Sequence, residues 1–292
     1  MVVEAAKGFK RILLATDGSE QSAVAAGAAT SLALGSSAEV RVIHVWNLEV
    51  HHRYGYWDVE VRSEAERLVD AIVSRLRTAG VRADRVICRA ASSHVADAVA
   101  GAARDFNADV VIVGSRGLSD WQSMVKHSVS HQLLCDLDCP LLVVRGRSTG
   151  ADGGALRVLL AIAGGDDIAP GVHAAAAAVA TPGSKVLVVH VRQALIGAQG
   201  FAYVEPDDEV GATMATTIKL LSDAGVEATG LVAHSGPVAK VVAEIASNWQ
   251  ADLIVTGSSR MGDLGSVIFG SVSHDLLRVA DRPVLIAERV GS

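Results

Sequence analysis

Short apolar runs alternate with amphipathic, helix-like segments along the whole chain. Runs such as "VVIV" and "LLVV" lack polar alternation, which is typical of strands that are covered on both faces of a parallel sheet. Alternation of such strands with helices, joined by right-handed crossovers, indicates a doubly wound α/β layer. In the first half, the pattern predicts strands at Ile12–Ala15, Val40–Val45, Arg85–Cys88, Val110–Val113 and Leu141–Val144, and helices at Gln21–Leu34, Glu60–Ala79, His94–Phe106 and Val129–Asp136.

The second half of the chain repeats the first. "RILLATDGS" from Arg11 returns as "RVLLAIAGG" from Arg157, and "SVSHQLLCDLDCPLLVVR" from Ser128 returns as "SVSHDLLRVADRPVLIAER" from Ser271. The join, "GRSTGADGGA", has the Gly, Ser and Asp content of a short linker. We therefore predict domain 1 at residues 1–146, a linker at 147–155 and domain 2 at 156–292, each a five-stranded parallel sheet flanked by helices.

Composition narrows the class of protein. The 292 residues carry a net charge of −6, so there is no general basic footprint for nucleic acid. No apolar run approaches the roughly 20 residues that span a bilayer, and the start of the chain lacks the layout of a signal peptide. We therefore expect a cytoplasmic protein with no membrane partner. The three cysteines match neither a zinc site nor a redox pair, so we expect no metal and reduced thiols.

Polar residues and glycines follow the first and the fourth of the expected strands. Ligands of open α/β sheets bind beyond the carboxyl ends of the strands, near the reversal of strand order. Asp17 follows the first strand, and its carboxylate could accept hydrogen bonds from a ribose. Gly114 and Gly117 follow the fourth strand, where their amides could approach a phosphate closely. Asp17 is equally suited to cap the next helix, a role that Ser19 could also fill.

Both halves resemble the universal stress protein family, a nucleotide-binding α/β domain that is often found in tandem. The family's mark is Gly-x-x-Gly, nine residues, then Gly-Ser or Gly-Thr, and members that bind ATP add an Asp after the first strand. The His-Val that ends the second strand and the Pro-led last strand also match. The resemblance implies nucleotide contacts at Ala15, Thr16, Asp17, Val45, Val113, Gly114, Arg116, Gly117, His127, Ser128, Val129 and Ser130 in the first half, and at Val191, Gly257, Gly270, Ser271, Val272 and Ser273 in the second.

Each half departs from the family pattern. In the first half His127 replaces the third glycine, and its ring either excludes a phosphate by bulk or donates a hydrogen bond to it. The alternative is that the loop has relaxed because binding is no longer needed. In the second half Arg260 replaces the second glycine and Ala163 stands where Asp17 would align. The first half is therefore expected to be the better adenosine site.

Other polar clusters offer weaker signals. Residues His51 to Trp57 fall on an expected loop after the second strand, which suits an aromatic flap over a base, a partner contact or, less well, a metal. His131 and His274 occupy equal positions in the last helix of each half and are expected to pack or cap rather than to catalyse. No Gly-rich loop ends in Lys-Ser or Lys-Thr, so there is no P-loop, and we expect no catalytic residues.

The sequence thus predicts a cytosolic universal stress protein that binds an adenine nucleotide, ATP above others, mainly in domain 1. Mg²⁺ would enter only as the counter-ion of ATP. The protein would act as a stress-response sensing or signalling module and not as an enzyme. The alternatives are a nucleotide-free interaction module and, less favoured, an adenylate-chemistry enzyme. The resemblance also implies that the last strands of the two domains pair across a pseudo-twofold axis, and it allows for a homodimer.

Overall fold

A computed structural model describes ten segments of the chain: residues 8–51, 55–58, 62–115, 129–146, 154–163, 168–179, 181–197, 200–234, 236–257 and 271–287. These segments form two compact units, and the division falls between Gly153 and Gly154. We call them the N-terminal unit, from Phe9 to Gly146, and the C-terminal unit, from Gly154 to Ala287.

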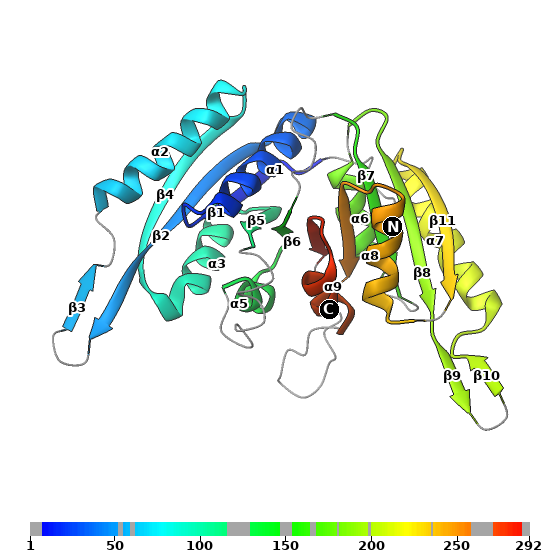
Figure 1. The fold of residues 1–292 in the computed structure, drawn as a ribbon. Helices are drawn as coiled ribbons and strands as arrows, with labels where there is room; N and C mark the ends of the chain where they lie inside the picture. The colour runs from blue at the N-terminus through cyan, green and yellow to red at the C-terminus, as the bar shows by residue number, and fades with distance from the viewer. Residues whose placement is uncertain are drawn as a thin grey trace. The chain divides into compact units, whose positions relative to one another are not determined.

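The N-terminal unit contains a parallel sheet in the order β4-β2-β1-β5-β6 (Figure 1). The chain builds outward from β1 in one direction and then returns to its other side with β5, so the strand order reverses between β1 and β5. The strands are β1 Arg11–Thr16, β2 Glu39–His51, β3 Gly55–Asp58, β4 Arg82–Ala91, β5 Val110–Gly114 and β6 Leu141–Val144, and the helices are α1 Glu20–Ser36, α2 Arg62–Thr78, α3 Val95–Phe106 and α5 Val129–Asp136.

The C-terminal unit repeats this plan with the order β11-β8-β7-β12-β13, again parallel. The expected fold, two repeated doubly wound domains with five-stranded parallel sheets, is confirmed. The strands are β7 Arg157–Ile162, β8 Lys185–Arg192, β9 Ala194–Gly197, β10 Gly200–Tyr203, β11 Glu227–His234, β12 Leu253–Gly257 and β13 Val284–Ala287, and the helices are α6 Ile168–Ala178, α7 Asp207–Asp223, α8 Val238–Asn248 and α9 Ser271–Val279.

Helices cover both faces of each sheet. In the N-terminal unit α1 packs beside α2 and α3 packs beside α5, and in the C-terminal unit the pairs are α6 with α7 and α8 with α9 (Figure 1). The central strands are buried along their whole apolar runs, as the absence of polar alternation predicts: Val110, Val111 and Ile112 have no exposed surface. The core therefore lies on both faces of each sheet.

The segment after the second strand is not the loop that we expected. Instead β2 continues to His51 and turns back into the antiparallel strand β3, while its other edge pairs with β4 as far as Leu48 and Ala91. The prediction was wrong because main-chain pairing holds this extension together. Such pairing needs no run of apolar side chains, so the sequence carries no signal for it. The C-terminal unit carries a related hairpin, in which β9 pairs with β10.

Matching side-chain contacts start the first strand of each unit. The carboxylate of Asp109 accepts hydrogen bonds from the amides of Lys10, at 2.6 Å, and Arg11, at 3.1 Å. Asp252 accepts in the same way from the amide of Arg157, at 2.8 Å. Because each carboxylate lies just before β5 or β12, it ties that strand's start to the start of its neighbour. These two aspartates have the structural role that their place before a buried strand suggests.

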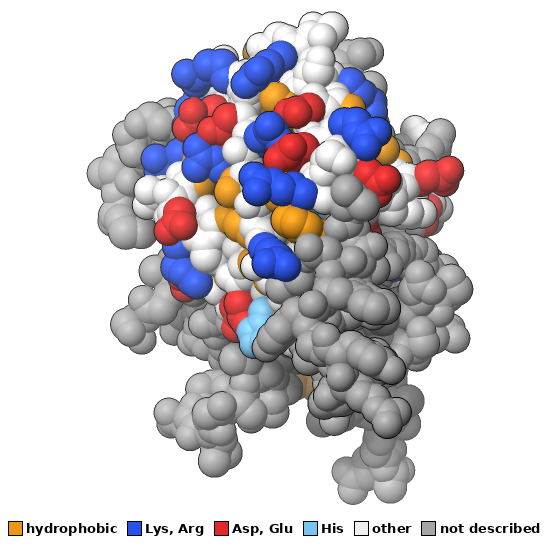
Figure 2. All heavy atoms as spheres, turned by 90° about the vertical axis from the view of Figure 1, so that its left-hand side faces the viewer, with side chains coloured by type: hydrophobic (Ala, Val, Ile, Leu, Met, Phe, Trp, Pro, Cys, Tyr) orange, Lys and Arg blue, Asp and Glu red, His pale blue; other side chains and the backbone are white. Residues whose placement is uncertain are grey.

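Basic and acidic side chains are intermixed over α2 and the edge strand β4 (Figure 2). Arg41 forms a bidentate contact with Asp84, at 2.8 Å and 2.5 Å, and Arg85 pairs with Asp70 at 2.9 Å. Charged residues on an edge strand discourage pairing with another sheet. Among the helices that the structure describes, none combines the length and apolar character needed to cross a bilayer.

The burial of Asp109 is expected to make the free energy of unfolding depend on pH. Burial raises the pKa of its carboxyl above the ordinary value, although the amides of Lys10 and Arg11 oppose this shift. A raised pKa means that the contribution to stability is complete below the unfolded-state pKa, about 4, and is lost as the pH rises through the folded-state value. The Asp109→Asn variant lacks this titration.

We therefore expect the free energy of unfolding of the wild type, relative to Asp109→Asn, to fall as the pH is raised from about 3.5 to 7. Urea titrations of both proteins across this range measure the difference. A difference that grows with pH would show that the hydrogen bonds outweigh burial.

Candidate functional site

The reversal of strand order brings several of the expected site residues to one edge of the N-terminal sheet. Ala15 near the end of β1 is in register with Val113 of β5, and Thr16 is in register with His44 of β2. Gly114 is the last residue of β5. The carboxyl ends of β1, β2 and β5 therefore meet at the place where open α/β sheets bind ligands.

The turn after β1 holds Asp17 in a fixed position. Its Oδ1 accepts a hydrogen bond from the amide of Ser19 at 3.0 Å, and the Thr16 hydroxyl accepts one from the amide of Gly18 at 3.3 Å. Ser19 is the N-cap of α1, and its hydroxyl accepts from the amide of Ser22 at 3.3 Å. Ser19 is therefore the residue that caps the helix, and not Asp17. Asp17 is exposed and lies at the carboxyl edge of the sheet, where the strand order reverses.

His44 on β2 stabilises the end of β1. This buried side chain, 5% exposed, has its Nδ1 at 2.8 Å from the carbonyl oxygen of Thr16. Because a carbonyl oxygen only accepts, Nδ1 is the protonated nitrogen in this contact. The His-Val pair in the sequence thus has two roles: His44 fixes the end of β1, and Val45, on the opposite face of β2, is buried in the core.

Gly114 owes its lack of a side chain to packing. A Cβ at this position would lie 2.6 Å from both the carbonyl carbon and the carbonyl oxygen of Gln21, and 2.8 Å from the amide nitrogen of Ser22. The end of β5 therefore touches the backbone of the first turn of α1. We had expected this glycine to permit close approach of an anion, and the structure supplies a second and sufficient reason for it.

Part of the expected site lies outside the described residues. This applies to Arg116, Gly117, His127, Ser128, Arg260 and Gly270. Val129 and Ser130 open α5 and Ser271 opens α9, but the structure describes only the backbone of these three residues.

Three residues describe the corresponding edge of the C-terminal unit. Ala163, in the place of Asp17, is exposed and offers no acceptor side chain. Among the described residues, a Cβ on Gly257 would meet no atom within 4 Å. The buried Ser273 hydroxyl donates to the carbonyl oxygen of Gly257 at 2.9 Å, which uses the only proton that it has to donate. Of the other expected residues, Val191 is buried and Val272 is half-buried.

The end of β8 is filled by side chains of the C-terminal unit itself. Arg192, 7% exposed, stacks on the ring of Tyr203 at 4.0 Å and forms an ion pair with Asp207. The neighbouring His190 holds Glu205 through Nε2 at 2.7 Å. These contacts hold the segment after β10 against the carboxyl end of β8. None of the residues that make them belongs to the glycine motif.

Sequence reasoning missed two buried polar residues next to Gly114. Ser115 is 8% exposed, and its amide donates to the carbonyl oxygen of Val144 at 3.0 Å. Arg145 follows β6 and is only 6% exposed, and burial lowers the pKa of its guanidinium. The sequence signal for Arg145 is a charged residue directly after an apolar strand. The aligned residue of the repeat, Glu288, is charged as well.

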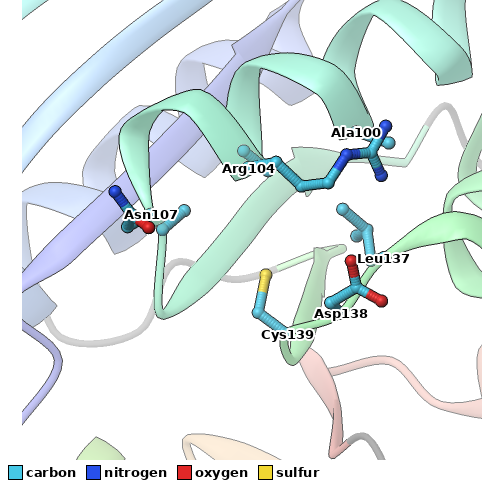
Figure 3. A pocket seen from close by; sticks show the side chains of 8 residues that line it. Ala100, Arg104, Asn107, Leu137, Asp138 and Cys139 are labelled. Atoms are coloured by element: carbon cyan, nitrogen blue, oxygen red, sulfur yellow. The ribbon is translucent and has the colours of Figure 1, made fainter.

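Two further features of the described residues concern possible metal ligands and a cavity away from the switch point. Within the described segments no three His, Cys, Asp or Glu side chains are grouped to hold a metal ion. A cavity of about 300 Å³ lies between the end of α3 and the turn before β6, with Arg104, Leu137 and Cys139 in its wall (Figure 3). Ala108 and Cys139 precede β5 and β6, so this cavity is at the amino edge of the sheet, opposite the switch point.

Comparisons with known proteins agree with the fold and its repeat. The model of the "Universal stress protein family" matches residues 8–145 and again 155–288. The chain is 29% identical over 150 residues to Universal stress protein YxiE of Bacillus subtilis (strain 168), covering 47% of this chain and 99% of that protein. It is 30% identical over 140 residues to a universal stress protein of Thermus aquaticus, covering 47% of this chain and 99% of that protein.

A solved structure extends the likeness over both halves. The crystal structure of a universal stress protein from Archaeoglobus fulgidus DSM 4304 superposes with a TM-score of 0.74 at 20% identity, covering 98% of each chain. The family match, however, is what decides membership, because it spans nearly the whole sequence. The chain belongs to the universal stress protein family and carries two of its domains in tandem.

The contrast between Gly114 and Gly257 gives a matched test of the packing argument. Neither glycine has a positive φ, and of the two only Gly114 has described backbone atoms within 3 Å of the place of a Cβ. Overpacking typically costs about 1–3 kcal/mol, and backbone atoms cannot move aside as side chains do. We therefore expect Gly114→Ala to lower the free energy of unfolding by about 3 kcal/mol and Gly257→Ala to change it by less than about 1 kcal/mol.

Chemical denaturation of the two variants measures these differences. Equal costs at both positions would show that the contact with α1 does not explain Gly114.

Proposed function

We propose that the protein binds an adenine nucleotide, ATP above others, at the switch point of the N-terminal unit. The observation that carries this proposal is the position of Asp17. Its carboxylate is held at the carboxyl end of β1 by the amide of Ser19, while the capping of α1 is left to Ser19 itself. The helix cap therefore does not require Asp17. Its carboxylate supports the turn through the Ser19 amide and lies at the edge of the sheet where a ribose would bind. Family membership supports the same role.

The two units are proposed to differ in function. Ala163 removes the ribose acceptor from the C-terminal unit, and the Ser273 hydroxyl is committed to Gly257. Binding is therefore proposed for the N-terminal unit first. In this proposal the protein is a stress-response sensing or signalling module without catalytic residues, and Mg²⁺ enters only with ATP. The cytoplasmic location, the pairing of the last strands and a homodimer stay predictions from the sequence.

A second candidate is a nucleotide-free module that works through protein contacts. It is favoured by His127, which places a ring where the family has its third glycine. The third, an adenylate-chemistry enzyme, would need turnover of ATP. Nucleotide released by acid from the freshly purified protein and identified by mass separates the first two candidates directly.

Asp17 provides the principal test. Hydrogen bonds to charged groups contribute about 1.5–3 kcal/mol, so we expect Asp17→Ala to weaken ATP binding roughly 10- to 150-fold. Titration calorimetry of wild type and variant measures this loss. Ser19→Ala is the matched control, because it removes the cap, at about 1 kcal/mol of stability, and leaves the carboxylate in place. An equal loss of ATP affinity in both variants would indicate a damaged turn rather than a lost ribose contact.

His127 decides what the altered motif does. If its ring obstructs the phosphates, His127→Gly tightens ATP much more than adenosine, because only ATP reaches that loop. If the imidazole grips a phosphate, the same change weakens ATP, and wild-type affinity rises as the pH falls through about 6.5. Thermal stabilisation is a convenient readout, since a ligand at 100 times its dissociation constant adds about 2.7 kcal/mol. No stabilisation of either protein by millimolar ATP would leave the interaction module as the better reading.

A further inference from the structure

The outer edges of the two sheets differ in charge. β4 is the edge strand of the N-terminal sheet, and β11 is the edge strand of the C-terminal sheet, where it pairs with β8 alone among the described strands (Figure 1). The two strands align in the repeat, "GVRADRVICR" with "GVEATGLVAH". The charged residues of β4 are Arg82, Asp84, Arg85 and Arg89. In β11 only Glu227 carries a formal charge. Charged side chains discourage an open edge from pairing with another strand, and β11 lacks most of them.

The ion pairs that flank β4 are replaced by uncharged residues at β11. Arg41 of β2 is in register with Asp84 of β4 and pairs with it. The corresponding residues of β8 and β11 are Leu187 and Thr229, which are again in register. The second pair joins α2 to β4, and there Gly230 takes the place of the arginine and an alanine of α7 takes the place of the aspartate. The change therefore affects the whole edge and not a single residue.

The centre of β11 is apolar and exposed. Gly230 faces α7, because a Cβ at this position would lie 2.8 Å from Sδ of Met214. Side chains alternate along a strand, so Leu231 points to the opposite face of the sheet. Leu231 is 40% exposed, and Thr229 on the same face is exposed as well. β11 therefore presents an open main-chain edge next to an uncharged, partly apolar face.

This edge is self-complementary when two copies meet antiparallel. A twofold axis at Leu231 places the Leu231 side chains of the two copies opposite each other, with about 4.5–5.5 Å between their Cβ atoms. Thr229 then lies opposite Ala233 of the second copy. The two Glu227 residues lie at opposite ends of the ribbon, about 26 Å apart along the strands. Parallel pairing in register would instead set these carboxylates side by side, where like charges repel.

We propose that β11 is a docking edge for a second copy of this chain, which pairs antiparallel through its own β11 about a twofold axis at Leu231. The contact joins two C-terminal sheets into one. It lies on the side of β8 away from β7, so it does not cover the switch point between β7 and β12. It also differs from the pairing of last strands that the family resemblance implies, because β11 and β13 are at opposite edges of the C-terminal sheet. The inference does not depend on nucleotide binding.

Disulfide formation at one register is the sharpest test. Leu231→Cys places two thiols opposite each other at the axis, within the Cα separation of about 4.4–6.8 Å that a disulfide needs. In Thr229→Cys the two thiols are four residues apart along the ribbon, about 13 Å, which is too far. We expect mild oxidation of the full chain, in which the added oxidant takes two electrons and two protons from the thiols, to cross-link Leu231→Cys alone. Non-reducing electrophoresis of both variants and of wild type measures this.

A charge at the axis tests the same contact without a covalent bond. Leu231→Lys sets two ammonium groups opposite each other, so we expect it to halve the mass of the wild-type assembly in light scattering. The matched control is Leu34→Lys on α1, since Leu34 is 39% exposed and Leu231 is 40% exposed. We expect Leu34→Lys to leave the mass unchanged.

The opposite results overturn the proposal. They are a wild type that stays monomeric at high micromolar concentration, a Leu231→Lys assembly as large as that of wild type, or an equal loss of mass in both lysine variants. Cross-linking of Thr229→Cys as readily as Leu231→Cys contradicts the register. If Leu231→Lys fails to fold, the disulfide decides the matter: folded Leu231→Cys that does not cross-link overturns the twofold contact.

Discussion

The contact between Gly114 and the first turn of α1 is the constraint on which the carboxyl edge of the N-terminal unit depends. Backbone lies against backbone there, with 2.6 Å from a notional Cβ to Gln21. This contact fixes the start of α1 relative to the end of β5. The turn that holds Asp17 precedes α1, so the same contact fixes its position relative to Gly114. Since packing alone requires the glycine, Gly114 is weak evidence for a ligand. Asp17 bears on a ligand more directly, because its carboxylate lies at the carboxyl edge while Ser19 caps the helix.

The two units share their amino edges and differ at their carboxyl edges. Asp109 and Asp252 bind the start of the neighbouring strand in the same way. Asn107 after α3 and Gln250 after α8 have the same left-handed conformation. These groups determine strand register, so a change in either unit would cost stability. At the carboxyl edge, Asp17 of the first half is replaced by Ala163 in the second. A difference at that edge is what two domains with one scaffold and unequal binding roles would show.

The sequence predicted the five parallel strands of each sheet because their apolar runs are uninterrupted and buried on both faces, but it missed the antiparallel strands β3, β9 and β10. It failed at the ends of β2 and β4, where main-chain pairing extends the strands beyond the core. It could not choose between Asp17 and Ser19 as the cap, because both residue types cap helices well. Nor could spacing separate a glycine that approaches a phosphate from one that approaches a helix, since both need the same missing Cβ.

The altered glycine motif does not by itself decide whether the N-terminal unit holds phosphates. Such a loop binds an anion through two separable contributions, the backbone amides that approach it closely and the positive charge around it. His127 bears on the first, because a ring replaces a hydrogen at one point of approach. Arg260 bears on the second, because it brings a positive charge to the motif of the second half in place of a glycine. The first half keeps Asp17 as a ribose acceptor, whereas Ala163 in the second half offers none. Counting glycines measures only the amide contribution. The same degree of motif decay is therefore expected to have different consequences in the two halves.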